Sequence, residues 1–163
     1  RSRPARGRRS SPRRGGRCAV LGTHFYSTIE TANGYNVDAA ARQARSIDHG
    51  AMRLLVPVHL GAHWVLVLVD IAAECVLYYD SLGGYKQRVV DVLRGWCREH
   101  MGCVDADWWL SIRAHAPRQE NTWDCGVFVL AMAERLMAGE PFEFTQGDMP
   151  NMRRRIARAI LDQ

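Results

Sequence analysis

Four polar side chains in this sequence are of the types that together cleave amide bonds by a thiol mechanism. Cys125 opens a segment that reads as a buried helix, where the helix dipole and free N–H groups favour a thiolate. A cysteine nucleophile needs a base and a group that orients the base, and His63 and Asp80 are the candidates. Gln119 stands six residues before Cys125, and its amide can donate to an oxyanion. Taken singly, such residues are more often a core cysteine, a strand-edge histidine, a turn acid and a loop glutamine, so their arrangement has to decide.

A predicted hairpin brings His63 and Asp80 together. Apolar runs rich in Val, Leu and Tyr predict strands over Trp64 to Ile71 and Cys75 to Tyr79, joined by a short loop at about Ile71 to Glu74. This register places Asp80 opposite about Val65, with His63 as a diagonal neighbour at roughly 7–8 Å between backbones. Side chains can close that gap, so the hairpin supports a paired base and orienting acid.

The remaining pattern predicts a mixed α+β domain in which a buried helix packs on a small sheet. Hydrophobic spacing and the positions of Gly and Pro set the expected boundaries. We expect a helix starting within His24 to Ile29, a turn at Asn33-Gly34, a helix over Val37 to Arg45, a strand over Arg53 to Val58, a turn over Ser81 to Tyr85, a helix over Lys86 to His100 stopped by Gly102, a strand over Asp107 to Arg113, the buried helix over Asp124 to Ala138 ending at Gly139, and a basic helix over Asn151 to Leu161 opened by Met149-Pro150.

Residues 1–17 differ in composition from the rest of the chain. They hold eight arginines and no acid, so the remainder has 14 basic against 17 acidic residues and a charge of about −3. Their Arg, Ser, Pro, Gly and Ala offer too little apolar surface to offset chain entropy, which predicts a disordered tail before one domain at 18–163. Such a run can serve in nuclear import or in a loose nucleic-acid contact, or can be an inert terminus.

Several other classes of protein are disfavoured by the sequence. The longest strongly apolar stretch, Trp64 to Val69, is far shorter than the roughly 20 residues of a membrane span, and we expect a soluble intracellular protein. The five cysteines form no CxxC pair, which suits free thiols in a reducing compartment. The spacing of Cys97, His100 and Cys103 is reminiscent of metal ligands, but a fourth ligand is missing and we expect no zinc there.

Four segments in order give a specific resemblance. They are VPVHLGAHWVLVLVD, YYDSLGG, RQENTWDCGVFVL and EPFEFTQGDMPNMRRRIARAIL, and together they resemble the SUMO-specific cysteine proteases of the Ulp/SENP family. The likeness runs from about His24 to the C-terminus. It implies a papain-like cysteine protease fold, with the nucleophile on the buried helix.

The resemblance also implies roles for individual residues. His63, Asp80 and Cys125 match the catalytic triad, and Gln119 matches the oxyanion-hole glutamine. Two further residues, Trp64 and Gly126, are expected to contact the substrate, with Trp64 lining a channel for the Gly-Gly tail of a SUMO-type ubiquitin-like modifier. The implied enzyme is a monomeric nuclear peptidase, also possible in the cytoplasm, that matures the modifier or removes it from conjugates. It needs no metal or organic cofactor, touches no membrane, and meets nucleic acid only through the Arg-rich tail.

Three departures from the family pattern stand beside these matches. A WLND-like opening segment is absent, which predicts an N-terminally truncated domain. Gly34-Tyr35 is not followed by the Arg-Arg-Trp stretch that supplies a second wall of the glycine channel. Trp123 stands where the family often has a small residue, and its bulk could be tolerated at the site or could obstruct it.

The basic residues Arg153 to Arg155 of the last predicted helix can meet acids on the modifier or form a solvated helix face.

Two other functions compete with the peptidase. A catalytically impaired relative would bind the modifier without cleaving it. A basic nucleic-acid protein would depend on residues 1–17 alone, because the rest is slightly acidic and shows no nucleic-acid-binding motif.

Overall fold

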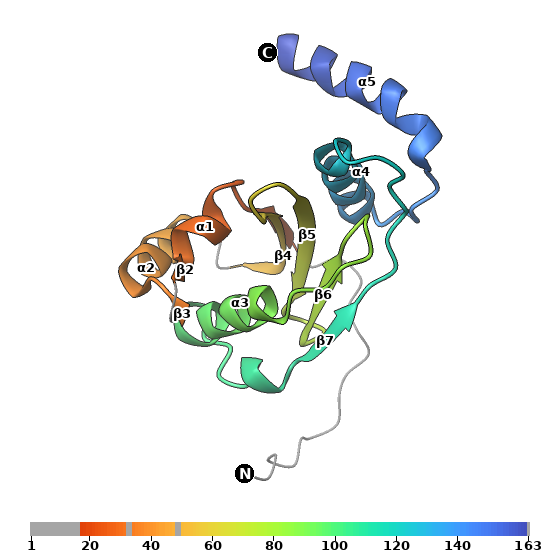
Figure 1. Cartoon of the computed structure of the whole chain (residues 1–163). Coiled ribbons are helices and arrows are strands. Elements are labelled where there is room, and N and C mark those ends of the chain that lie inside the picture. Colours follow the sequence, from red (N-terminus) through yellow and green to blue (C-terminus); the bar gives the residue numbers. More distant parts are fainter. Residues whose placement is uncertain (1–16, 32–33, 48–49, 163) are drawn as a thin grey trace.

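A mixed β-sheet forms the centre of the molecule (Figure 1). The computed structural model describes residues 17–31, 34–47 and 50–162. These described residues form a five-stranded sheet in the order β1-β4-β5-β6-β7. The strands β4, β5 and β6 are antiparallel, and β1 and β7 flank them as parallel neighbours. Their bounds are β1 Arg17–Val20, β4 Ala51–His59, β5 Trp64–Asp70, β6 Cys75–Tyr79 and β7 Leu110–Arg113.

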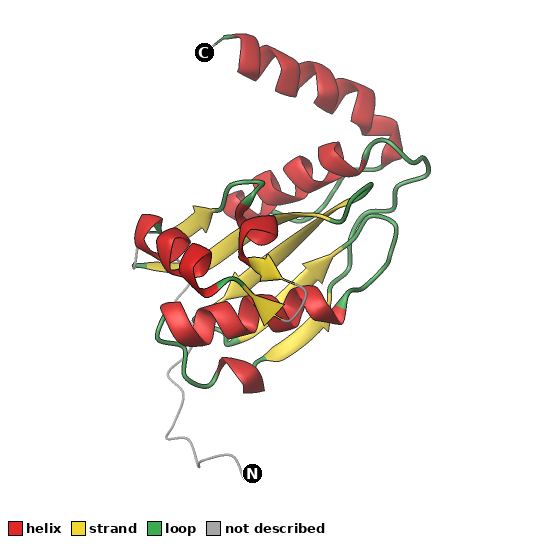
Figure 2. Ribbon diagram, turned by 60° about the vertical axis from the view of Figure 1, so that its left-hand side comes forward, coloured by secondary structure: helices red, strands yellow, loops and turns green. Residues whose placement is uncertain are grey.

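The central strands are apolar on both faces because helices cover both faces (Figure 2). Alternate residues point to opposite sides. Leu54 and Val56 of β4 belong to one buried cluster, whereas Leu55 between them belongs to the other. Pro57 is tolerated inside β4 because the pairing with β1 ends at Leu55, so its missing N–H falls on an unpaired edge.

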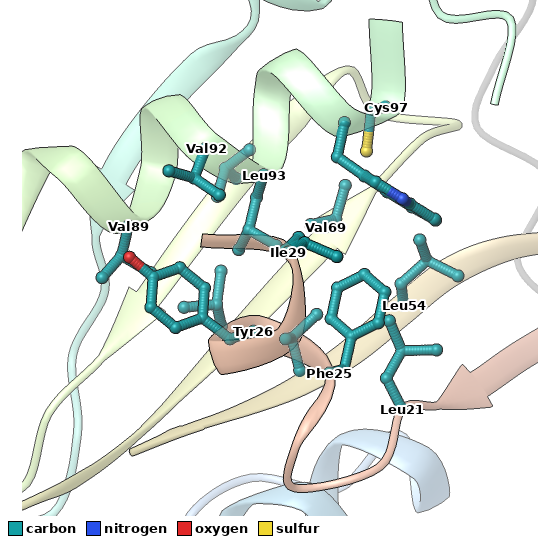
Figure 3. Close-up of a cluster of buried hydrophobic side chains, with 14 of the residues drawn as sticks. Leu21, Phe25, Tyr26, Ile29, Leu54, Val69, Val89, Val92, Leu93 and Cys97 are labelled. Carbon is teal, nitrogen blue, oxygen red and sulfur yellow. The ribbon is translucent and has the colours of Figure 1, made fainter. Parts of the chain in front are cut away.

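Three helices cover the first face of the sheet: α1 Phe25–Ile29, α2 Val37–Ser46 and α3 Gln87–His100. Figure 3 shows side chains of α1 and α3 meeting over this face. The Phe25 ring packs edge-on against Trp96 of α3 at 5.1 Å between centroids. The indole N–H of Trp96 donates to the carbonyl of Ala40, so this helix layer is held by both packing and a buried hydrogen bond.

The helix α4, Cys125–Ala138, covers the second face. Phe128 and Met132 are fully buried there, and Gly139 ends the helix in a left-handed conformation with φ of 69°. The last helix, α5 Met149–Leu161, follows a 3₁₀ turn, η2 Gln146–Asp148, and lies on the far side of α4 from the sheet (Figures 1 and 2). Met149 anchors its start in the core.

Most predicted elements are confirmed with shifts of one or two residues, and so is the α+β class. The predicted strand over Asp107 to Arg113 begins only at Leu110, because Ala106–Trp108 form a 3₁₀ turn, η1, with Ala106 buried. The strand β1 was not predicted: it begins at Arg17, the last residue assigned to the tail.

The small strands β2 Glu30–Thr31 and β3 Gly34–Tyr35 pair with each other, and the predicted turn at Asn33-Gly34 falls partly outside the described residues. Residues 1–16 of the predicted tail also lie outside them. Within the described ranges, no helix combines the length and apolarity that crossing a membrane requires.

Candidate active site

His63 is placed by the tight turn between β4 and β5. The backbone N–H of Leu60 donates to the carbonyl of His63 at 2.8 Å, and Gly61 supplies the positive φ of 87° that the turn requires. His63 therefore lies directly before β5, with its side chain 20% exposed.

Asp80 directly follows β6, beside His63. Leu66 pairs with Tyr79, so the next pair in this register would be Val65 with Asp80, as the hairpin pattern predicts. The two side chains do close the gap, because Nε2 of His63 lies 2.7 Å from Oδ1 of Asp80. The carboxylate is 8% exposed and also accepts hydrogen bonds from the N–H groups of Leu82 and Gly84.

The hydrogen bond between His63 and Asp80 determines which imidazole nitrogen can act as a base. A neutral imidazole that donates from Nε2 to Asp80 keeps its lone pair on Nδ1. Three hydrogen bonds to the Asp80 carboxylate hold it in one orientation. Asp80 is thus suited to orient His63 and to stabilise the imidazolium that forms when Nδ1 takes a proton.

Gln119 is buried, at 6% exposure, and is attached to the loop that follows Asp80. Its backbone N–H donates to the carbonyl of Ser81, and the Ser81 hydroxyl donates to Oε1 of Gln119 at 2.9 Å. Nε2 of Gln119 donates to the carbonyl of Asn121 at 2.5 Å. The prediction that Gln119 is an oxyanion donor stays a prediction, but its amide is fixed near the nucleophile loop. Reasoning from the sequence missed Ser81, although the YDS motif contains it.

Cys125 is the first residue of α4 and is 5% exposed. The residue before it, Asp124, is 4% exposed and is held by three side chains. Asn121 and Gln146 donate to Oδ2 at 2.6 and 2.7 Å, and Arg153 of α5 donates to Oδ1 from Nε and Nη2 at 2.8 and 2.6 Å. Burial raises the pKa of the Asp124 carboxyl, but these hydrogen bonds outweigh burial and leave the pKa below its ordinary value.

The same network extends to the loop that carries Gln119. Gln146 accepts from the backbone N–H of Glu120, and Arg153 donates to the carbonyl of Trp123. Three of the four arginines on α5 therefore have partners within the chain, because Arg154 donates to Asn151 of the same helix and Arg155 pairs with Glu134 of α4. Arg153 was predicted to meet acids on the modifier or to lie on a solvated helix face; its side chain is 49% exposed, and it is also tied to the start of α4.

A cleft of about 760 Å³ opens beside Cys125. Trp64 and Gly126 line it, and a Cβ placed on Gly126 would lie 3.8 Å from Cδ1 of Trp64. His59 stacks on Trp64 with 4.4 Å between ring centroids, which steadies the indole. Ala62 also lines the cleft, so both chain neighbours of His63 face the same space as the thiol.

The other four cysteines are free thiols that lie outside the cleft beside Cys125. Burial raises the pKa of the Cys18, Cys75, Cys97 and Cys103 thiols, which keeps them protonated at neutral pH. Among the residues that the structure describes, no three His, Cys, Asp or Glu side chains are arranged to hold a metal ion.

A cysteine at a helix start beside a cleft, a hydrogen-bonded His–Asp pair and a buried glutamine have the chemistry of a thiol hydrolase. Residues 7–163 match the model of the Ulp1 protease family, C-terminal catalytic domain. The chain therefore belongs to the Ulp1 protease family.

Curated relatives and solved structures agree with this family. Sentrin-specific protease 3 of Mus musculus is 32% identical over 150 residues, which cover 83% of this chain and 24% of the relative. The ubiquitin-like-specific protease ESD4 of Arabidopsis thaliana is 30% identical, with 89% of this chain and 32% of the relative covered. The chain thus spans about a quarter to a third of these relatives.

Among solved structures, the Ulp1-like SUMO protease catalytic domain of Chaetomium thermophilum is 25% identical with a TM-score of 0.72, covering 86% of this chain and 58% of that one. The Ulp1 protease domain in complex with Smt3, the yeast orthologue of SUMO, is 23% identical with a TM-score of 0.77, covering 89% and 68%. These likenesses confirm the predicted fold class.

Proposed function

We propose that this chain is a thiol peptidase that cleaves after the C-terminal Gly-Gly of a SUMO-type modifier. The observation that carries the proposal is the 2.7 Å pairing of His63 with Asp80 at the edge of the cleft that Cys125 lines. Family membership supports the same chemistry, because the matched relatives are named as sentrin-specific and ubiquitin-like-specific proteases.

The proposed acylation step begins with a proton moving from Cys125 to Nδ1 of His63. The thiolate attacks the carbonyl carbon of the terminal glycine, and the electron pair moves to the carbonyl oxygen. In this mechanism the N–H groups at the start of α4 and the amide of Gln119 stabilise that oxyanion. His63 then gives its proton to the leaving amine, the C–N bond breaks, and a thioester remains on Cys125.

Deacylation uses the same residues, with His63 acting again first as a base and then as an acid. His63 accepts a proton from water, the resulting hydroxide attacks the thioester carbonyl, and the C–S bond breaks. The modifier leaves as a carboxylic acid that releases its proton to solvent, and the Cys125 thiolate recovers a proton from His63. Asp80 keeps the imidazole oriented through both steps.

A cleavage assay tests this proposal. The substrate is a SUMO domain joined through Gly-Gly to a reporter protein, and the matched control substrate carries Ala-Ala instead. We expect wild-type chain to release the reporter only from the Gly-Gly fusion and Cys125→Ala to release none. Stable binding of the SUMO domain by folded wild-type chain without any release would instead establish a non-catalytic binding module.

We further propose that the protein acts in the nucleus, on the basis of the eight arginines among residues 1–17. A fluorescent fusion of the chain is expected to accumulate in nuclei and to lose that preference when residues 1–17 are removed. An unchanged distribution would contradict this location signal.

A further inference from the structure

Trp123 is the least buried large aromatic residue that the structure places at the cleft. Its exposed fraction is 70%, although it lies between the buried Asp124 and the loop of Gln119. It lines the same cleft as Trp64 and Cys125. An exposed indole next to a reactive thiol is unusual, because tryptophan normally buries most of its large apolar surface.

The backbone of Trp123 is fixed on both sides, so its position at the cleft is set by the fold. Its N–H donates to Oδ1 of Asn121 at 3.2 Å, and its carbonyl accepts from Nη2 of Arg153 at 2.9 Å. Asn121 and Arg153 are in turn bound to Asp124. The network therefore holds the backbone of Trp123 at the cleft, and only rotation of its side chain can move the indole.

The chemistry of the cleft indicates what the indole contacts. Trp64 lies against Gly126, the residue after Cys125, and Trp123 adds a second flat apolar surface to the same cleft. Between such surfaces, a peptide without side chains fits best, because its backbone can lie flat against an indole. Aromatic residues in this position also contribute strongly to binding at interfaces.

We propose that Trp123 is a specificity-determining residue that packs on the C-terminal glycine tail of the modifier, as a second aromatic wall besides Trp64. This inference rests on the proposed function and deepens it. It also assigns a role to Trp123, because the sequence does not decide whether this bulky residue is tolerated at the site or obstructs it. Trp123 binds and orients the tail, whereas proton transfer belongs to His63 and Cys125.

The test compares three variants of the whole chain: Trp123→Ala, Trp123→Phe and the matched control Trp108→Ala. Trp108 is also an exposed tryptophan, at 55%, but it lies in η1 and does not line the cleft. Two rates are measured for each variant. One is cleavage of the Gly-Gly fusion over a range of substrate concentrations, and the other is alkylation of Cys125 by iodoacetamide, which needs no modifier.

We expect Trp123→Ala to reduce kcat/KM for the fusion about tenfold, mainly through a higher KM, because an aromatic contact to substrate is lost. Trp123→Phe should recover part of that loss, and Trp108→Ala should match wild type. Alkylation of Cys125 should change less than about twofold in all three, since Trp123 is not part of the thiol chemistry.

Other results would overturn the inference. Equal cleavage by Trp123→Ala and wild type would show that the indole does not contact the substrate. A parallel loss of alkylation and cleavage would show that Trp123 acts by shaping the surroundings of Cys125. If wild-type chain is alkylated normally but never cleaves the fusion, the proposed function itself fails, and the inference fails with it.

Discussion

Asp80 owes its orientation to the glycine turn after β6 as much as to His63. The N–H of Gly84 donates to Oδ2 at 2.9 Å, and the absence of a side chain at this residue allows the close approach. A Cβ at residue 84 would lie only 2.6 Å from the same oxygen. The glycine is thus a requirement of the carboxylate geometry.

We predict that Gly84→Ala reduces cleavage about tenfold to a hundredfold, because the displaced carboxylate misplaces the base. The matched control is Gly22→Ala, where an added Cβ meets nothing within 4 Å. Fusion cleavage and thermal unfolding are measured for both. A fully active and folded Gly84→Ala chain would show that the Asp80 orientation does not limit the reaction.

Local pattern predicts the His63–Asp80 pair but not its supporting residues. Strand alternation and a short loop fix the register, and the register brings the two side chains together. The hydrogen bond from Ser81 to Gln119 spans 38 residues, and that from Gln146 to Asp124 spans 22. No periodicity links such distant polar residues, so only the folded chain reveals them.

At the scale of elements, α5 holds the start of α4 through Arg153 and Asp124. The pKa of Asp124 is lower in the folded chain than its ordinary value of 3.8, because hydrogen bonds outweigh burial. A lowered pKa adds stability that is complete above the ordinary value and is lost as the pH falls toward the folded value. The contact between α4 and α5 should therefore weaken in acid.

We predict that Asp124→Asn lowers the free energy of unfolding by about 1–3 kcal/mol at pH 7, since charge-assisted hydrogen bonds to Arg153 are lost. The difference from wild type should shrink below pH 3.8, where the wild-type carboxyl also becomes protonated. Urea unfolding at several pH values measures this. Glu134→Gln, which removes the exposed pair with Arg155, is the control and should change stability by less than about 1 kcal/mol. A difference that stays constant with pH would contradict the account.

Element type was easier to predict than element boundaries. The alternating strands and the helix ending at Gly139 follow from local residues. The strand β1 has only four residues and gains its pairing from β4, which lies more than thirty residues away. Similarly, residues 108–113 (WWLSIR) have the composition of a strand, but the burial of Ala106 and Trp109 favours a 3₁₀ turn at the start of this segment. Tertiary contacts override local preference in both places.

Across the whole molecule, the sheet separates two buried clusters that share the same strands. Val67 and Leu68 are adjacent in β5, yet they belong to different clusters. Loss of packing on either face therefore weakens the sheet that carries His63 and Asp80. Such sharing makes the fold a single cooperative unit.

We predict that Phe128→Ala on one face costs about 3–5 kcal/mol and that Leu93→Ala on the other costs about 2–5 kcal/mol. Both residues are at most 1% exposed. Calorimetry and circular dichroism should each record one unfolding transition for either variant. Two separate transitions would show that the helix layers unfold independently.

Covalent capture by a SUMO domain with a C-terminal vinyl sulfone tests the central claim most directly. Mass spectrometry of the purified chain should find one modifier attached at Cys125, no adduct with Cys125→Ala, and much slower capture with His63→Ala. An adduct at another cysteine, or none at all from folded wild-type chain, would contradict the assignment of Cys125 as the nucleophile.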